Sequence, residues 1–286
     1  MERFVDLHVH STCSDGVYTP EEVVTMAVDA GLTAMALADH DSIAGVETAC
    51  AAGKQLGVEV LTGVELSVVW NQWNDIHLLG YGFDPRHAAL GEALEEFRAH
   101  RETRNEKIVD NINLRLKEEG LAPIDFTRVA ALADGALGRP HIARALMEKG
   151  YAVDMEDAFR RYLRLCNVEK WAFPVTQAID LIHRAGGVAV LAHPPFITNR
   201  RSRLERLIKA FAEMGLDGIE IYNSGTSDDQ FPWYLHLARS LGMIVTGGSD
   251  FHGIEGNHER LGYVRGVQRV PYSCVDEIRG CLETRA

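Results

Sequence analysis

The sequence has few cysteines and few positive charges, and both shortages limit what the protein can be. Its five cysteines form no Cys-x-x-Cys pair and are odd in number, which indicates reduced thiols in a cytoplasm and not a disulfide framework. With 29 Lys and Arg against 41 Asp and Glu, the net charge is −12, which argues against a broad face for duplex DNA. A small phosphorylated ligand is still allowed, because bound metal cations supply positive charge locally.

Long apolar runs and nucleophile motifs are also missing. No apolar run approaches the ~20 residues that a membrane span requires, and no signal-peptide pattern precedes the first strand-like segment, so we expect a cytoplasmic protein with no membrane contact. The sequence contains no Gly-x-Ser-x-Gly elbow and no phosphate-binding P-loop pattern. A covalent mechanism is therefore disfavoured.

Strand-like and helix-like segments alternate in the first hundred residues and again after about residue 170. Seven short apolar segments are expected to be strands: 4–10, 34–38, 59–63, 77–81, 188–192, 218–222 and 244–247. Helical patterns between them, such as the one that opens at Thr19 and Pro20, predict parallel strands with helices outside. We therefore predict an α/β barrel with about seven strands, fewer than in the usual barrel of this kind.

The middle of the chain departs from this alternation. Helical patterns are expected at 90–119, 125–133, 139–149 and 155–165, with glycines between them. Residues 101–170 carry 13 Lys and Arg against 12 Asp and Glu, whereas the rest of the chain carries 16 against 29. We therefore predict a barrel domain of residues 1–100 and 171–286, with residues 101–170 as a helical insertion that caps it.

Histidines and carboxylates occur where the predicted strands end. Two of them, His8 and His10, are two apart on the first strand, so both point to the same face. Strand ends of a barrel gather at one mouth, and imidazoles with carboxylates are ligands for divalent metal ions. The predicted ligand set is His8, His10, Asp15, His40, Glu65, His77, His193, Asp250 and His252.

Single members of this set allow other interpretations. An isolated His-x-His pair in mid-strand is often structural, and His77 begins a strand-like run, so it is also interpretable as a core or edge histidine. The remaining histidines lie in helical or loop segments and, with the exception of His141, are interpreted as solvated or structural. The combination of so many ligand types at strand ends is what favours a metal site.

Five motifs follow one another along the chain. They are Asp-x-His-x-His-Ser-x-x-Ser-Asp-Gly at 6–16, Ala-Asp-His-Asp-Ser at 38–42, Gly-Val-Glu-Leu-Ser at 63–67, His-Pro at 193–194 and Gly-Ser-Asp-Phe-His-Gly at 248–253. In this order they resemble the motifs of the PHP (polymerase and histidinol phosphatase) family. The resemblance implies a distorted (β/α)7 TIM-like barrel with two or three metal ions, related to the amidohydrolases.

The helical insertion refines this resemblance. Its segment 138–144, Gly-Arg-Pro-His-Ile-Ala-Arg, is similar to the TrpH-like branch of the family. That branch contains a 3′,5′-nucleotide bisphosphate phosphatase and 5′-to-3′ exonucleases acting on short RNA. The resemblance implies one metal at His8, His10, Glu65 and Asp250, a second at Asp15, His40 and His252, and a third at His77 and His193 with Glu65 bridging.

The predicted ligands suggest metal-assisted hydrolysis at phosphorus. Neighbouring metal ions lower the pKa of a bridging water from near 16 toward roughly 7, and the resulting hydroxide attacks phosphorus in line. His193, Asp250 and Glu65 are the predicted catalytic residues, and His193 or a metal-bound water is a candidate donor of the proton to the leaving oxygen. The ligand types suit manganese, iron or zinc about equally, and only the resemblance favours Mn²⁺.

The substrate's terminal phosphate requires further donors. Arg139 precedes Pro140 at a predicted helix start, where free N–H groups and the helix dipole favour an anion. An exposed surface arginine is the alternative interpretation. Weaker candidates are His141, Lys170, Arg200 in a basic run, and Asn223 after a predicted strand. A base could also stack on Phe196 or Tyr222, although aromatic residues there are more often part of the core.

The leading prediction is a phosphatase that releases the 3′-phosphate of nucleoside 3′,5′-bisphosphates. The alternative is a 5′-to-3′ exonuclease or oligoribonuclease on short 5′-phosphorylated RNA, which uses the same metals on a phosphodiester. An amidohydrolase of C–N substrates ranks third, because no lysine is an obvious candidate for carbamylation. A metal-stabilised accessory module without activity is the remaining alternative. No protein partner is evident from the sequence.

Overall fold

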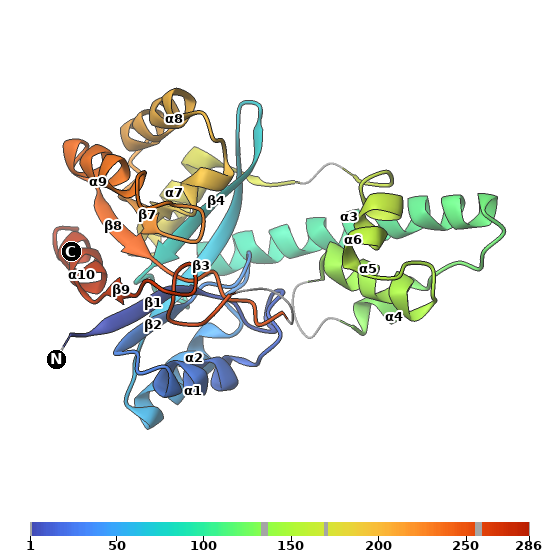
Figure 1. Cartoon of the computed structure of the whole chain (residues 1–286), viewed down its shortest axis with the longest axis horizontal. Coiled ribbons are helices and arrows are strands. Elements are labelled where there is room, and N and C mark those ends of the chain that lie inside the picture. Colours follow the sequence, from blue (N-terminus) through green and yellow to red (C-terminus); the bar gives the residue numbers. More distant parts are fainter. Residues whose placement is uncertain (1, 133–136, 169–170, 255–258, 286) are drawn as a thin grey trace. The chain divides into compact units, whose positions relative to one another are not determined.

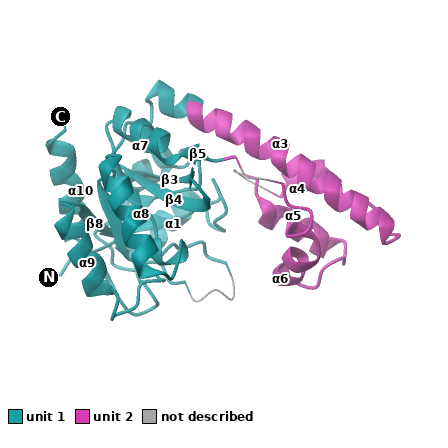
Figure 2. Cartoon of the chain, turned by 90° about the horizontal axis from the view of Figure 1, so that it is seen from above, with its two compact units in different colours: residues 1–92, 172–286 teal, residues 93–171 magenta. Residues whose placement is uncertain are grey.

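The computed structural model describes residues 2–132, 137–168, 171–254 and 259–285, and the chain divides into two compact units. Unit 1 comprises Met1–Glu92 and Ala172–Ala286, and unit 2 comprises Ala93–Trp171 (Figure 2). The predicted boundary between residues 100 and 101 lies inside α3 (Ala88–Glu118), which continues from one unit to the other. The role of the helical segment as a cap stays a prediction.

Unit 1 is built on a nearly closed sheet, shown in Figure 1. All seven predicted strands are present, as β1 (Phe4–Val9), β2 (Ala34–Leu37), β3 (Glu59–Trp70), β4 (Trp73–Tyr81), β6 (Val188–Leu191), β7 (Gly218–Tyr222) and β8 (Ile244–Gly247). Two short strands, β5 (Phe173–Pro174) and β9 (Val270–Pro271), were not predicted. The order along the sheet is β8-β7-β6-β4-β3-β2-β1-β9, and β5 pairs with β3. The predicted α/β barrel is therefore confirmed.

The end of β8 returns to β1 and nearly closes the barrel. The amide of Asp250 donates to the carbonyl of His8 at 2.9 Å, and the amide of His10 donates to the carbonyl of Phe251 at 2.9 Å. This approach requires a glycine at position 248, because a Cβ there would lie 2.3 Å from the Cβ of His8. The motif that carries Asp250 is thus fixed directly against β1, which carries His8 and is followed at once by His10.

The prediction of parallel strands is wrong at β4. Only Asn71 and Gln72 separate β3 from β4, so no helix can cross between them and the two strands form an antiparallel hairpin. β4 is also antiparallel to β6, with Leu78 opposite Leu191. Glu65 and His77, expected at the end and the start of strands, lie inside these two longer strands.

Helices surround the sheet of unit 1, as α1 (Pro20–Asp29), α2 (Val46–Leu56), α7 (Val175–Arg184), α8 (Arg201–Glu213), α9 (Phe231–Ser240) and α10 (Ser273–Glu283), with a short 3₁₀ turn η2 (Pro194–Phe196). The predicted start of α1 is confirmed, because Thr19 and Glu22 form a capping box. α10 was not predicted. Buried aliphatic residues of the strands, among them Val5 and Val190, share a hydrophobic core with Ile278 of α10.

All the regular secondary structure in the described residues of unit 2 is helical, as predicted for the insertion. After α3 come α4 (Phe126–Ala130), α5 (Arg139–Glu148), α6 (Met155–Ala158) and a π-helical turn η1 (Phe159–Leu163). The unit has a hydrophobic core of its own, which includes Ile112, Leu116, Ile142, Leu146 and Tyr162. Among the helices of the described residues, none has the length and apolar character that a bilayer span requires.

Candidate metal centre

All nine predicted ligand residues gather in one cluster of unit 1, and the Glu65 carboxylate lies at its centre. Its oxygens lie 3.4 Å from His8 Nε2, 3.4 Å from His10 Nε2, 2.8 Å from His40 Nδ1, 3.0 Å from His77 Nδ1 and 2.9 Å from His193 Nε2. Asp250 approaches the same imidazoles, at 3.4 Å from His8 and 3.2 Å from His10. The structure therefore brings together residues that lie up to 244 positions apart in the sequence.

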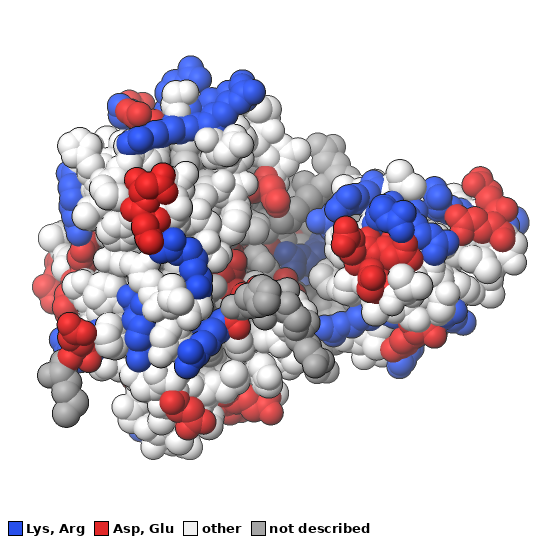
Figure 3. All heavy atoms as spheres, in the orientation of Figure 1, with Lys and Arg blue, Asp and Glu red and all other residues white. Residues whose placement is uncertain are grey.

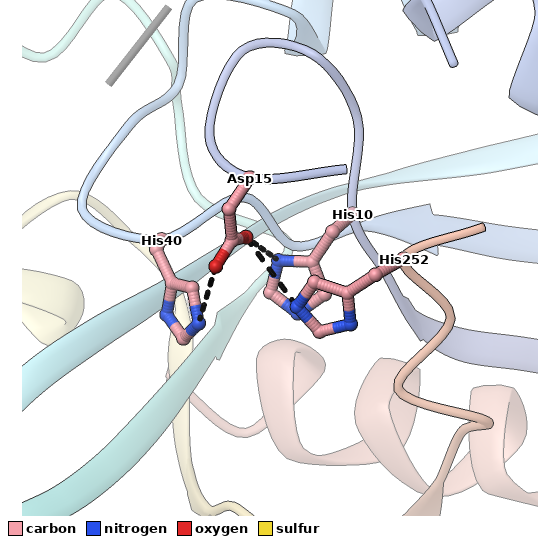
Figure 4. Close-up of side chains that lie close together, drawn as sticks. All are labelled: His10, Asp15, His40 and His252. Carbon is pink, nitrogen blue, oxygen red and sulfur yellow. Dashed lines mark ion pairs between the residues drawn. The ribbon is translucent and has the colours of Figure 1, made fainter. Parts of the chain in front are cut away.

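Asp15 is the centre of a second group, shown in Figure 4. Its carboxylate oxygens lie 3.3 Å from His252 Nε2, 3.8 Å from His10 Nδ1 and 3.8 Å from His40 Nε2. One ligand atom from each of these four residues lies within 4.8 Å of the other three. The same criterion groups His8 and His10 with Glu65, and His40 and His77 with Glu65. Three overlapping sets of donors are thus arranged as metal sites are.

The bonding of these atoms tests whether they fit metal ions. Six buried ligand-type atoms make no well-formed hydrogen bond among the described residues, although two of them, His40 Nδ1 and Glu65 Oε2, lie 2.8 Å apart; the six are His8 Nε2, His10 Nε2, Asp15 Oδ1, His40 Nδ1, Glu65 Oε2 and His193 Nδ1. An unpartnered buried polar atom costs about 1–3 kcal/mol, and proteins rarely leave several together. Imidazole nitrogens and carboxylate oxygens are donors for manganese, iron or zinc. The donor set fits divalent cations.

Electrostatics keeps the carboxylates of the cluster ionised. Burial alone would raise the pKa of Glu65, but the imidazoles of His40 and His77 hold this pKa well below its usual value. Burial also acts to raise the pKa of Asp15, yet the nearby imidazoles of His40 and His252 hold it well below its usual value. Both residues therefore present negative oxygens to a cation.

The imidazoles differ in their protonation. Burial and the neighbouring His252 lower the pKa of His10 to about 3, so this ring is neutral at pH 7. Burial acts to lower the pKa of His252 too, but its contact with Asp15 raises it to about 9. The metal-free cluster thus holds a proton on His252 that a metal ion has to displace.

Glu220 is a member of this region that sequence reasoning missed. It lies on β7, is fully buried, and accepts a hydrogen bond from His8 Nδ1 at 3.0 Å and from the amide of His193 at 2.7 Å. With Nδ1 as donor, a neutral His8 keeps the lone pair of Nε2, on the side of Glu65, for a metal ion. Its only sequence signal is a carboxylate in the apolar strand Gly-Ile-Glu-Ile-Tyr.

Two buried aspartates fix the backbone that carries predicted ligands. Asp6 accepts hydrogen bonds from the amide and the hydroxyl of Ser249, at 2.9 and 2.6 Å, and so holds the segment before Asp250. Asp39 accepts from the amide of Ser11 at 2.7 Å and from the hydroxyl of Ser14 at 2.6 Å, and so shapes the loop before Asp15. We infer that these aspartates position the ligands without being ligands themselves.

Two predicted ligands have unusual backbone conformations. His193 has a φ of 25° and Asp250 a φ of 59°, a left-handed region that side chains other than glycine rarely adopt. His193 comes two residues after the end of β6, and Asp250 comes three residues after the end of β8. Such strain costs about 1–3 kcal/mol per residue and persists at functional sites, where surrounding contacts enforce it.

Unit 2 contains a group of arginines that sequence reasoning found only in part. Arg139 is the first residue of α5, as predicted, and its guanidinium lies 5.6 Å from the Phe159 ring. Burial, together with the nearby cations Arg139 and Arg101, lowers the pKa of Arg104 to about 10. We name Arg101, Arg104 and Arg139 the arginine cluster. Arg101 and Arg104 are three residues apart on α3, and this spacing places both on one face of the helix. The spacing does not indicate that Arg139 of α5 lies near them.

The remaining predicted substrate residues have different surroundings. His141 is buried, and its Nδ1 accepts the Gly138 amide hydrogen at 3.1 Å at the start of α5. Asn223 is buried and uses its side-chain amide to hold the turn after β7. Arg200 is exposed before α8, and Lys170 lies outside the described residues. Their contact with substrate stays a prediction.

Comparisons with known proteins agree with this geometry. Residues 6–173 match the family model described as the PHP domain. The chain is 38% identical over 256 residues to a 5′-3′ exoribonuclease of Haemophilus influenzae (88% of this chain, 91% of that protein). It is 36% identical over 262 residues to a 3′,5′-nucleoside bisphosphate phosphatase of Chromobacterium violaceum (87% of each). A crystal structure from Bifidobacterium adolescentis, described as a candidate metal-dependent phosphoesterase, superposes with a TM-score of 0.83 at 31% identity, over 98% of this chain and 96% of that one.

Proposed function

Because this chain belongs to the PHP domain family, we propose that it is a metal-dependent phosphatase that removes the 3′-phosphate of nucleoside 3′,5′-bisphosphates. The observation that carries the proposal is the cluster around Glu65 and Asp15, whose buried donor atoms make no well-formed hydrogen bond among the described residues. The similarity to the Chromobacterium violaceum phosphatase supports the choice of substrate.

Two or three divalent ions are proposed to bind here. His8, His10, Glu65 and Asp250 would hold one ion, Asp15, His40 and His252 a second, and His77 and His193 a third with Glu65 shared. Divalent ions in such a site lower the pKa of a coordinated water and neutralise phosphoryl charge. We propose Mn²⁺ as the ion, with Fe²⁺ and Zn²⁺ as alternatives that the same ligand types accept.

The residues of the chain supply orientation and proton transfer. Glu65 and Asp250 keep their negative charge and hold the imidazoles of His8 and His10 around one point. His193 is placed by its hydrogen bond to Glu65 and by its backbone bond to Glu220. With two ions bound, His193 is not needed as a ligand, and we propose that it then lies beside the leaving O3′ oxygen and delivers a proton to it.

The 5′-phosphate of the substrate is proposed to bind the arginine cluster of unit 2. Two observations support this role. The pKa of Arg104 is lowered by burial and by its cationic neighbours, and Arg139 is the first residue of α5, where the helix dipole favours an anion. A phosphate relieves the repulsion between these guanidinium groups and accepts their paired N–H donors. Recognition of this second phosphate would distinguish a bisphosphate from an ordinary phosphate ester.

A second candidate function is a 5′-to-3′ exoribonuclease, which the similarity to the Haemophilus influenzae protein favours. Both reactions break the bond between phosphorus and the O3′ oxygen of a 5′-phosphorylated nucleotide. They differ only in whether that phosphorus carries a further nucleotide. The same ligands and the same proton donor serve both reactions.

Product analysis with the manganese-loaded protein tests the proposal. The substrates are adenosine 3′,5′-bisphosphate, a 5′-phosphorylated oligoribonucleotide and a set of dipeptides, with an Asp15→Asn variant as control for contaminating phosphatases. Release of inorganic phosphate from the bisphosphate is the expected result. Release of mononucleotides from the RNA alone would replace the proposal by its second candidate, and hydrolysis of dipeptides alone would overturn both.

A further inference from the structure

A cavity of about 230 Å³ lies in unit 1 between η2, the start of α8 and the start of α9. Aromatic side chains line much of it, namely Phe196, Trp233 and Tyr234, together with Arg201 and Gln230. Binding sites that enclose a whole drug-sized ligand are larger, from about 300 Å³ upward. The cavity is thus sized for a single ring system.

The cavity adjoins the candidate metal centre. The Phe196 ring lies 5.5 Å from the ring of His193, measured between centroids, and the Phe196 amide donates to the carbonyl of His193 at 3.0 Å. α8 and α9 follow β6 and β7, so both helices begin at the end of the sheet where the ligands lie. A molecule bound at His193 therefore has Phe196 as a direct neighbour.

Phe196 is fixed in place yet exposed. A Cβ at Gly225 would lie 3.0 Å from Pro195 Cβ and 3.2 Å from two atoms of the Phe196 ring, so the loop after β7 packs closely on this ring. The residue is nevertheless 61% exposed. A rigid aromatic ring with an open surface, next to a hydrolytic site, is the arrangement by which proteins stack nucleobases.

The charge around the cavity is positive. The guanidinium of Arg201 lies 4.4 Å from the ring centroid of Trp233, and no ion pair with a described carboxylate is formed by Arg200, Arg201 or Arg203. Their neighbour Glu205 pairs with Lys209 instead. Figure 3 shows Lys and Arg gathered over the part of unit 1 where Figure 1 places α8. This charge complements the phosphates of a nucleotide whose base enters the cavity.

We propose that this cavity is a subsite for a nucleobase of the substrate, which stacks on Phe196 while Arg201 faces the nucleotide's negative charge. The inference rests on the proposed function and deepens it. The base belongs either to the nucleoside that leaves from the scissile phosphate or to the next nucleotide of a short RNA. Both sources present the same chemistry to the cavity, an aromatic heterocycle beside a phosphate.

Steady-state kinetics of Phe196→Ala with matched substrates tests the subsite. The substrates are adenosine 3′,5′-bisphosphate, ribose 3,5-bisphosphate, the dinucleotide pApA, and pApA without its second base. We expect KM to rise on the order of 10-fold for substrates that place a base in the cavity, the effect of losing one base–aromatic stack. KM for ribose 3,5-bisphosphate should not change, and Phe196→Trp should restore stacking. Val267→Ala, which shortens another exposed apolar side chain of unit 1, is the control.

The outcomes separate the two sources of the base. A rise in KM for the adenosine bisphosphate assigns the cavity to the leaving nucleoside, and a rise for pApA that disappears without its second base assigns it to the next nucleotide. No rise for any substrate, or an equal rise for ribose 3,5-bisphosphate, would overturn the subsite. Calorimetric binding of AMP and ribose 5-phosphate gives a readout without hydrolysis. A base-dependent affinity that Phe196→Ala removes would support the subsite even if the proposed phosphatase activity failed.

Discussion

The Nδ1 atom of His8 lies 3.0 Å from the Oε1 atom of Glu220, and both side chains are fully buried. A carboxylate that accepts from one ring nitrogen fixes the tautomer and orientation of the other, which here is the nitrogen facing Glu65. Glu220 also holds the amide of His193 at 2.7 Å. One carboxylate behind the cluster therefore positions two predicted ligands.

Replacing Glu220 should weaken metal binding without removing a ligand. We expect Glu220→Gln to lower the affinity for Mn²⁺ by roughly 10- to 100-fold, the usual effect of losing a hydrogen-bonded partner of a metal ligand. Titration against a chelator measures this affinity. Asp217→Asn is the matched control, because Asp217 accepts from His183 Nε2 at 2.8 Å outside the cluster. Equal losses of affinity in the two variants would show that Glu220 acts through general stability alone.

Metal affinity should depend on pH through His252, and also through His8, His40 and His193, whose pKa values the neighbouring carboxylates raise despite burial. Its pKa of about 9 means that the ring is protonated at pH 7 in the metal-free protein, whereas a metal ligand has to be neutral. Affinity therefore rises as the pH increases from 7 toward 9, by about tenfold per unit for each proton displaced. His10, with a pKa of about 3, has no proton to lose in this range. Dissociation constants measured at several pH values check the slope, and a flat profile would contradict the assignment of His252.

Arg139 should act on substrate binding and not on the chemical step. We expect Arg139→Ala to raise KM for adenosine 3′,5′-bisphosphate by roughly 10-fold or more, the effect of losing a charged hydrogen bond, and to leave KM for an aryl phosphate unchanged. The control is Arg98→Ala, since Arg98 is exposed on α3 and pairs with Glu95. If both substrates responded equally to Arg139→Ala, the arginine cluster would have no role in binding the second phosphate.

The close approach at Gly248 predicts a stability effect. An alanine Cβ would lie 2.3 Å from the Cβ of His8 and 2.4 Å from its backbone nitrogen, so β1 or the segment after β8 has to shift. We expect Gly248→Ala to destabilise the fold by about 1–3 kcal/mol and to reduce metal binding. Gly91→Ala is the matched control, because nothing lies within 4 Å of a Cβ there and helix propensity favours alanine. Urea unfolding of both variants checks the difference, and equal stability would refute the clash.

Seven strands of unit 1 were predictable because each contains a short apolar run of characteristic length. The direction of β4 was not, because the Asn71-Gln72 turn has no glycine or proline and the two strands of the hairpin read as separate runs. β9 was missed because a two-residue strand has almost no pattern of its own, and the helix α10 that follows it was not predicted either. Direction and short pairings depend on contacts in space that a single sequence does not display.

The candidate ligands were predictable because metal sites require a few residue types, and these types stand at or near strand ends. Glu220 was not found, because a single carboxylate in an apolar strand does not indicate a role in the site. Its role is recognised only from its contact with His8 in the folded protein. Arg104 was not predicted as a candidate phosphate-binding residue for the same reason, because its neighbour Arg139 comes from another helix. The predicted metal ligands thus leave a local signal in the sequence, whereas Glu220 and Arg104, whose neighbours come from elsewhere in the chain, are recognised only in the folded protein.

The metal content of the purified protein tests the central claim most directly. After reconstitution with Mn²⁺ and removal of free ions, elemental analysis should give two or three equivalents per chain. Glu65→Ala should lose at least one of them, because Glu65 contacts His8, His10, His40, His77 and His193. Fewer than one equivalent in the reconstituted wild-type protein would contradict the account.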